Sequence, residues 1–522
     1  MTFARRSVLV VAVLSLVACQ AKVPTPTPVP QATDAATPTA AATLTASPTA
    51  RPTRTPVPTL LGIAWDDRSP FGSGLIASEQ GVLGQLGGAS IYQIDLQIAD
   101  DLLHLDGQQD VRYSNQETEP LNEVYFRLFP NLFGGATEIH AVEVNDQEVR
   151  PTYELADSAM RVPLSPALQP GEQVVIEITF SVVVPPEGEG NYGIFGYMSD
   201  VLALAHFYPM IAVYDDEGWN VEIPSPYGDV VYADSSFYLV RVSAPAALTI
   251  VASGVETQRQ VTGDRQQIAY AGGPMRDFYL VASTEYTVVS ERLGETTVNS
   301  YAPADLAEGA RTTLRHAVDA LRAFNERFGV YPFTELDIVS TATSALGIEY
   351  PGIIAMAMRL YPPKTEYSPA YLESTLAHEV SHQWFYSAVG NDQLDEPWLD
   401  EALAQYSTLL YWRDLYGPPG AEGFRGSLHE RWGRVDNADI PVGMPVHAYA
   451  GKEYGAIVYG RGPLFVEVLA QEMGQKTFDA FLRDYYETFK WGIATTEGLK
   501  QLAESHCNCD LTPLFAEWVY ER

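Results

Sequence analysis

The stretch LAHEVSHQWF, residues 376–385, places His378 and His382 four positions apart, with Glu379 directly after the first histidine. In a helix these histidines lie on one face, one turn apart, which is the separation that two imidazoles need to bind one zinc ion. Glu379 then projects to the side, where it can act on a zinc-bound water without ligating the metal. The alternative interpretation is a pair of exposed helix histidines.

The residues on either side of this stretch predict that it is helical. Ser368 followed by Pro369 is typical of a helix start, because serine caps the first turn and proline is tolerated there. Gly390 is typical of a helix end. The sequence therefore predicts one helix from about 369 to 389.

A third ligand candidate follows in PWLDEALAQYSTLLYW, residues 397–412, whose apolar residues recur at helical spacing. Glu401 lies in the first turn of this predicted helix. The connection between the two helices is short enough to make them antiparallel neighbours, which brings Glu401 toward the histidines. Catalytic zinc commonly takes three protein ligands and one water, so this set predicts one zinc ion per chain.

The rest of the chain divides into two kinds of sequence. Residues 61–301 contain short runs rich in β-branched and aromatic residues, separated by Gly, Pro, Asn and Asp, which predicts an antiparallel β-sandwich or a related β-rich domain. Residues 302–522 have mostly helical spacing, beginning with LAEGARTTLRHAVDALRAFNERFG at 306–329. We expect a multidomain protein with a β-rich domain and a mainly helical domain that carries the metal site.

The N-terminus predicts export and attachment to a membrane. Residues 1–18 read as a signal peptide, with two arginines before a short apolar run, and the sequence Leu-Val-Ala-Cys that ends at Cys19 resembles a bacterial lipobox. Residues 19–60 are rich in Thr and Pro, which predicts an extended tether on a lipidated Cys19. We therefore expect an extracytoplasmic lipoprotein, on the cell surface or the periplasmic side.

Charge and cysteine content restrict the remaining possibilities. The chain has 66 acidic and 32 basic residues in 522, a formal charge of −34 that repels phosphate backbones, so we expect no nucleic-acid partner. Cys507 and Cys509 lie in ESHCNCD, next to His506. A local disulfide or two free thiols are favoured over a metal site there, because His506 and the two cysteines would place three ligands within four residues and give poor tetrahedral geometry. The sequence leaves the oligomeric state open.

The motifs together resemble the gluzincin zinc aminopeptidases, the family of aminopeptidase N and leukotriene-A hydrolase. That family has H-E-x-x-H, eighteen residues and then Glu, and eighteen residues separate His382 from Glu401 here. The likeness extends through YSNQETEPLNEVYFRLFPN, residues 113–131, FGVYPFTELDIVS, residues 328–340, and the segment 481–504. It implies a thermolysin-like catalytic domain. The family's long C-terminal helical domain has no counterpart here, which implies a more open cleft.

The resemblance assigns roles to single residues. His378, His382 and Glu401 bind zinc, and Glu379 is the general base that activates water for attack on a peptide carbonyl. The family stabilises the resulting oxyanion with a tyrosine. Within KEYGAIVYGRGPLFVEVL, residues 452–469, Tyr459 matches that position, and Tyr454 is the reserve choice.

The site that holds the substrate's amino group departs from the family pattern. Family aminopeptidases use the glutamate of a G-x-M-E-N segment, and ALGIEYPG, residues 345–352, retains it as Glu349 with the glycine displaced by one position and tyrosine in place of asparagine. A second amine anchor in the β-rich domain has no counterpart near 202–219. Asp400 and Ala402 replace the usual Asn and Gly beside the ligand glutamate.

These observations predict a zinc metallopeptidase with peptide substrates, and specifically an aminopeptidase. An endopeptidase that uses the same zinc site is the enzymatic alternative. A cell-surface binding protein that keeps the fold without turnover is the alternative from another class, although such a protein has no need for Glu379. The preferred side chain and the physiological peptide do not follow from the sequence.

Overall fold

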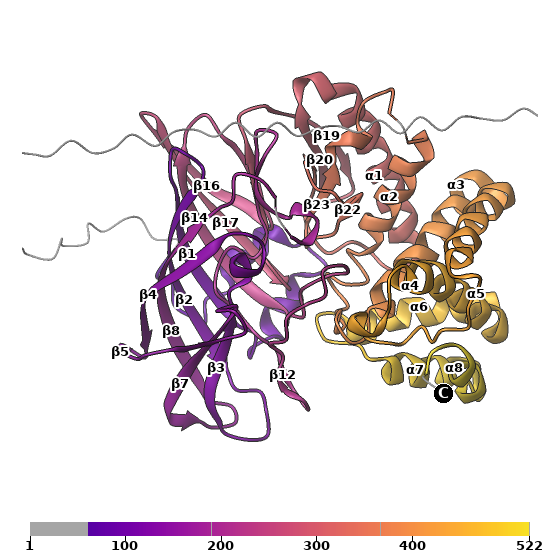
Figure 1. The fold of residues 1–522 in the computed structure, drawn as a ribbon, viewed down its shortest axis with the longest axis horizontal. Coiled ribbons are helices and arrows are strands. Elements are labelled where there is room, and N and C mark those ends of the chain that lie inside the picture. Colours follow the sequence, from indigo (N-terminus) through magenta and orange to yellow (C-terminus); the bar gives the residue numbers. More distant parts are fainter. Residues whose placement is uncertain (1–60, 189, 366, 521–522) are drawn as a thin grey trace, which may run out of the picture. The chain divides into compact units, whose positions relative to one another are not determined.

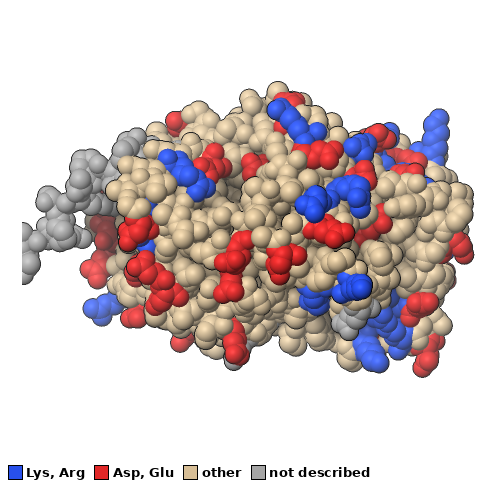
Figure 2. Space-filling view, turned by 90° about the horizontal axis from the view of Figure 1, so that it is seen from above, with Lys and Arg blue, Asp and Glu red and all other residues tan. Residues whose placement is uncertain are grey.

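The computed structural model describes residues 61–188, 190–365 and 367–520 (Figure 1). The signal peptide, Cys19 and the tether predicted for 1–60 lie outside the described residues. No helix in the described part of the chain combines the length and apolar character that a bilayer crossing needs. Figure 2 shows acidic side chains spread over one face of the molecule, with basic ones among them.

The β-rich part is built around an eight-stranded sheet with the order β16-β17-β14-β1-β2-β8-β4-β5. Adjacent strands are antiparallel except β1 and β14, which are parallel. On β8 every second residue from Val174 to Val182 is buried, as expected for a strand with one face on the core. The strands are β1 Ile91–Ile98, β2 His104–Ser114, β4 Ala136–Val144, β5 Gln147–Glu148, β8 Gln173–Val183, β14 Ser236–Pro245, β16 Val255–Thr262 and β17 Arg265–Met275.

Two four-stranded sheets and a short hairpin complete this part, with the orders β15-β18-β10-β9, β11-β3-β7-β6 and β12-β13. All of their pairings are antiparallel. The strands are β3 Leu121–Arg127, β6 Thr152–Glu154, β7 Ala159–Leu168, β9 Phe195–Met198, β10 Val201–Leu204, β11 Met210–Ile211, β12 Tyr214–Asp215, β13 Gly218–Trp219, β15 Thr249–Ala252 and β18 Leu280–Ser283. The predicted β-rich N-terminal architecture is confirmed.

The metal-site half opens with a five-stranded sheet of order β19-β20-β21-β23-β22, which Figure 1 shows beside α1 and α2. Its strands are β19 Tyr286–Leu293, β20 Thr296–Pro303, β21 Glu335–Thr341, β22 Gly347–Ile348 and β23 Ile353–Ala357. The boundary expected between 301 and 302 falls inside β20, which pairs in parallel with β21. The change to helical spacing near 302 marks the approach to α1, and this sheet begins before it.

Helices form the remainder and carry the metal-site segment. They are α1 Ala307–Arg327, α2 Pro369–Ser381, α3 Trp398–Trp432, α4 Glu453–Ala456, α5 Gly462–Met473, α6 Gln475–Phe489, α7 Thr496–Cys507 and α8 Thr512–Trp518. Short 3-10 turns lie at Ser69–Gly74, Gln80–Gly84, Phe129–Leu132, Asn191–Gly193, Ala304–Leu306, Met358–Leu360, Gly433–Val435 and Val446–Ala448. The predicted second helix continues twenty residues beyond 412, with a kink at Gly417, whose φ of 69° is followed by two prolines.

A buried arginine connects the two halves of the molecule. Arg276, between β17 and β18, donates hydrogen bonds of 2.5–3.1 Å to four backbone carbonyls, those of Ala233, Tyr386, Ala388 and Gly492. A side chain on Gly390 would overlap the guanidinium group. Glycine is therefore required at 390 by the close approach of Arg276, and the prediction that Gly390 ends a helix is wrong.

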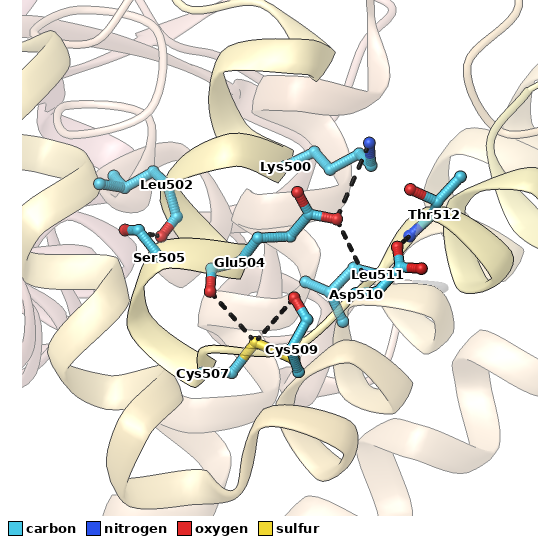
Figure 3. The surroundings of a disulfide bond; sticks show 9 residues. All are labelled: Lys500, Leu502, Glu504, Ser505, Cys507, Cys509, Asp510, Leu511 and Thr512. Atoms are coloured by element: carbon cyan, nitrogen blue, oxygen red, sulfur yellow. Dashed lines mark hydrogen bonds and ion pairs between the residues drawn. A yellow bond between two sulfur atoms is a disulfide. The ribbon is translucent and has the colours of Figure 1, made fainter.

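The cysteine pair near the C-terminus forms a local disulfide between Cys507 and Cys509, at the end of α7 (Figure 3). His506 points elsewhere, since its Nε2 lies 3.0 Å from Asp484 Oδ2. Of the two interpretations that the sequence favoured, the structure has the disulfide. Glu504 helps to hold the following turn because its carboxylate accepts the backbone N–H of Leu511.

Candidate active site

Helix α2 presents His378 and Glu379 to the site, and it ends earlier than expected. It stops at Ser381, and His382 caps it with helical angles of φ −64° and ψ −14°, so the histidines remain one turn apart. The chain then turns sharply, because the backbone N–H of Ser387 bonds to the carbonyl of His382, and Tyr386 has φ +130°. The predicted continuation of this helix to 389 is therefore wrong.

Three ligand atoms converge where α2 meets the first turn of α3. Nε2 of His378 lies 3.2 Å from Nε2 of His382, and Oε2 of Glu401 lies 3.1 Å and 3.6 Å from these two nitrogens. Zinc binds such atoms at about 2.0–2.1 Å in a tetrahedron, whose ligand atoms are then about 3.3 Å apart. All three side chains are buried, and the donor set is the one that zinc prefers, so the residues fit this metal.

The surroundings of the histidines prepare them to bind a cation. Nδ1 of His382 lies 2.9 Å from the carbonyl oxygen of Phe385, which selects the tautomer with a proton on Nδ1 and a free lone pair on Nε2. Burial lowers the pKa of His378 to about 4, which favours the neutral form that ligates a metal. Burial by itself would raise the pKa of Glu401, but the two neighbouring histidines hold it below its usual range.

Tyr459 approaches two of these three residues, Glu401 and His378. It lies in a π-helical turn, Ile457–Arg461, and its hydroxyl donates to Oε1 of Glu401. The next residue is glycine because α3 passes very close: a Cβ on Gly460 would lie 2.8 Å from the backbone nitrogen of Trp432. Tyr454 packs behind Tyr459 with 5.7 Å between ring centroids and does not line the cavity described below. The structure thus brings Tyr459 to the ligand set, whereas Tyr454 lies behind Tyr459 and away from the cavity.

Glu379 and Glu349 form the acidic side of the site. A carboxylate oxygen of each lies within 4.8 Å of the other and of a His382 nitrogen. Burial, together with the neighbouring charge of Glu349, raises the pKa of Glu379 well above its usual range. Gly347 of β22 presses against this carboxyl, because a Cβ there would lie 2.5 Å from Cγ of Glu379.

Asp229 is a site residue that the sequence analysis missed. It lies in the loop between β13 and β14, in the β-rich half, and lines the cavity beside Glu349. Burial raises its pKa well above the usual range, and the charges of Glu349 and Glu401 add to this effect. The surrounding sequence, SPYGDVV, has the composition of an ordinary turn and carries no signal of this role.

A cavity of about 830 Å³ gives access to these groups. Its volume is that of a site for a small molecule or a short peptide. Its walls come from the loop that carries Asp229, from β22, from one face of α2 and from α3 beyond its kink. His378, Glu379, Glu401, Glu349 and Tyr459 all line it. The arrangement therefore offers an accessible metal position flanked by carboxyl groups and one phenol.

Comparison with known proteins identifies the part of the chain that holds the ligands. Residues 312–518 match the peptidase family M1 domain. Aminopeptidase M1 of Arabidopsis thaliana is 22% identical over 411 residues, which span 73% of this chain and 46% of the relative. Aminopeptidase O of Rattus norvegicus is 26% identical over 234 residues, 39% of this chain and 28% of that protein. The chain thus spans less than half the length of either relative.

Solved structures share the fold. A mutant of the M1 zinc metallopeptidase from Deinococcus radiodurans superposes with a TM-score of 0.62 at 20% identity, covering 83% of this chain and 94% of that one. A two-domain M1 zinc metallopeptidase mutant bound to L-arginine gives 0.63 at 20% identity, with the same coverage. The β-rich and helical halves thus form a known two-domain architecture.

Proposed function

Because residues 312–518 belong to peptidase family M1, we propose that this protein is a zinc-dependent aminopeptidase that removes N-terminal residues from peptides. The observation that carries the proposal is the convergence of His378, His382 and Glu401, with ligand atoms 3.1–3.6 Å apart. When bound there, zinc supplies a Lewis acid that lowers the pKa of a bound water and polarises the peptide carbonyl. The family relatives named above are aminopeptidases.

Two side chains of the site handle the proton and the developing charge. Glu379, as carboxylate, takes a proton from the attacking water and then delivers it to the leaving amine. The Tyr459 hydroxyl, which donates to Glu401 in this structure, is placed to donate to the carbonyl oxygen as negative charge develops on it. Both groups line the same cavity.

The acidic side of the cavity supports exopeptidase action. Glu349 and Asp229 line it together, and they come from different halves of the molecule. Burial raises the pKa of both carboxyls, and a bound ammonium group would stabilise their charged forms. We propose that Asp229 supplies the second amine anchor for which the sequence has no family counterpart. A solved M1 zinc metallopeptidase mutant from Deinococcus radiodurans is bound to a Tyr-Ser-Ala substrate.

The test compares matched peptides with free and N-acetylated N-termini, incubated with the zinc-loaded protein and followed by mass spectrometry. We expect stepwise loss of N-terminal residues from the free peptides alone, and no loss with Glu379→Gln. Internal cuts in both peptide sets would indicate the endopeptidase instead. Zinc binding at one ion per chain without any cleavage would indicate the non-catalytic binding protein.

We also propose that the protein works outside the cytoplasm, attached to a membrane through a lipid on Cys19. The proposal rests on the signal-like residues 1–18 and the Thr/Pro-rich segment after Cys19, and the Cys507–Cys509 disulfide is in keeping with an oxidising compartment. Metabolic labelling with a radioactive fatty acid tests it. Label in the wild type and none in Cys19→Ala is the expected result, and unlabelled wild type would contradict the proposal.

A further inference from the structure

The second half of α3 gives the cavity a cationic end. Beyond the kink, residues spaced three and four apart turn one face of the helix toward the cavity. Among them are Ser427, Glu430 and Arg431, and Arg434 lines the cavity from the 3-10 turn Gly433–Val435 that follows. The end of α3 and the 3-10 turn after it thus contribute two guanidinium groups and one carboxylate, which leaves this end with a net positive charge in a protein of formal charge −34.

Among the residues that the structure describes, Arg431 has no carboxylate partner. Its side chain is partly buried, and one Nη donates to the carbonyl of Tyr459 at 3.3 Å. Within the described residues, neither Arg431 nor Arg434 forms an ion pair with an acidic side chain. A partly buried guanidinium has five N–H donors, so most of those of Arg431 stay available to a ligand.

Arg425 shows how an arginine on the same half of α3 is usually satisfied. It faces away from the cavity and pairs with Glu467, at 2.6 Å, and with Glu422. In the described part of the chain Arg425 forms ion pairs and Arg431 does not, and this difference arises because they lie on different faces of the helix. The cavity face keeps its arginines unpaired although acidic residues are twice as frequent as basic ones in the chain.

The two charged ends lie on different sides of the metal ligands. Glu349 clusters with Glu379 and His382, whereas Arg431 is close to Tyr459 and to the His378 side of the triad. A peptide whose amino group is at Glu349 places its first carbonyl at the triad. The residues after that bond then extend toward Arg431.

We propose that Arg431 and Arg434 bind a carboxylate of the peptide on the side of the residues that follow the cleaved bond. This inference rests on the proposed aminopeptidase function and adds a substrate class to it. The carboxylate has two possible sources: the C-terminus of a di- or tripeptide, which lies within about 7 Å of the cleaved bond at 3.3–3.6 Å per residue, or an acidic side chain. Charge-assisted bonds from arginine suit either source.

The test measures kcat/KM for three peptides: Leu-Gly-Gly, its C-terminal amide, and Leu-Glu-Gly-amide. For the wild type we expect kcat/KM to be about tenfold higher for Leu-Gly-Gly than for Leu-Gly-Gly-amide. If an acidic side chain also binds the arginines, kcat/KM for Leu-Glu-Gly-amide should exceed that for Leu-Gly-Gly-amide by a similar factor. In the double variant Arg431→Gln, Arg434→Gln both ratios should fall to about one. The matched control Arg425→Gln removes a charge from the same helix outside the cavity and should keep the wild-type ratios.

Ratios between peptides are the readout because a merely structural effect of Arg431 on Tyr459 would slow all three alike. Equal rates for all three peptides in the wild type, or ratios unchanged in the double variant, would overturn the inference. Binding of the same peptides to Glu379→Gln, followed by calorimetry, separates the two proposals. Tighter binding of a peptide with a carboxylate, without any wild-type hydrolysis, keeps the carboxylate site and rejects the aminopeptidase, and equal binding of all three peptides rejects the carboxylate site.

Discussion

Replacing Gly347 by alanine should disable the site without touching a metal ligand. The added Cβ would lie 2.5 Å from Cγ and from Oε1 of Glu379, and 2.6 Å from Cδ. Unstrained carbon atoms approach to about 3.5–4.0 Å, so the Glu379 carboxyl must retreat by roughly 1 Å. Gly347 cannot yield easily, because β22 is paired in register with Met356 of β23.

The size of the effect follows from the displacement. A misplacement of about 1 Å commonly costs on the order of 100-fold in rate, which corresponds to about 2.7 kcal/mol of activation free energy. We therefore expect kcat/KM on leucine p-nitroanilide to fall about 100-fold in Gly347→Ala. Zinc content should stay at one ion per chain, because His378, His382 and Glu401 lie beyond the collision.

Gly455→Ala is the matched control. Gly455 also lines the cavity, but no heavy atom lies within 4 Å of the Cβ that alanine would add. The activity of the Gly455→Ala variant should remain within about twofold of wild type, since alanine is accommodated in the α4 helix. The reasoning fails if Gly347→Ala keeps full activity, or if it loses zinc or its thermal transition, because the loss would then have a cause other than displacement of Glu379.

Three further predictions test the catalytic tyrosine, the buried arginine and a buried acid. Tyr459→Phe should lower kcat about 10²- to 10³-fold with zinc content unchanged, and an unchanged kcat would remove Tyr459 from catalysis. Arg276→Lys should lower the free energy of unfolding, measured in urea, by about 3 kcal/mol because backbone carbonyls from both halves lose their hydrogen-bond donor. A decrease of less than about 1 kcal/mol would show that Arg276 does not bridge the two halves. Burial raises the pKa of Asp392 to about 7, which means that the folded state favours the protonated carboxyl. The stability gained from this protonated form is therefore complete below about pH 4 and is lost as pH rises through about 7. Asp392→Asn should therefore be more stable than wild type by about 1–2 kcal/mol at pH 8 and equal at pH 4, and equal stability at both pH values would contradict the assignment.

The fold class and the ligand set were both accessible from the sequence because they depend on short-range periodicity. Strand alternation and helical spacing are local properties, and they predicted the β-rich half and the helical half. The spacing between His382 and Glu401 predicted that these groups meet, since a short link between neighbouring helices leaves few arrangements. The same local signals misled at Gly390, where the glycine accommodates Arg276 from a distant loop and does not end a helix.

What the sequence by itself determined is the chemistry at the centre: two histidines and a glutamate at a fixed spacing, a glutamate beside them, and a tyrosine further along the chain. Only the tertiary structure decided what surrounds that centre. Asp229 reaches it from a turn in the other half, Gly347 presses against Glu379 from an edge strand, and Arg431 faces the cavity while Arg425 does not. These contacts join residues far apart in the chain. Their geometry depends on how sheets and helices pack, and no local pattern records it.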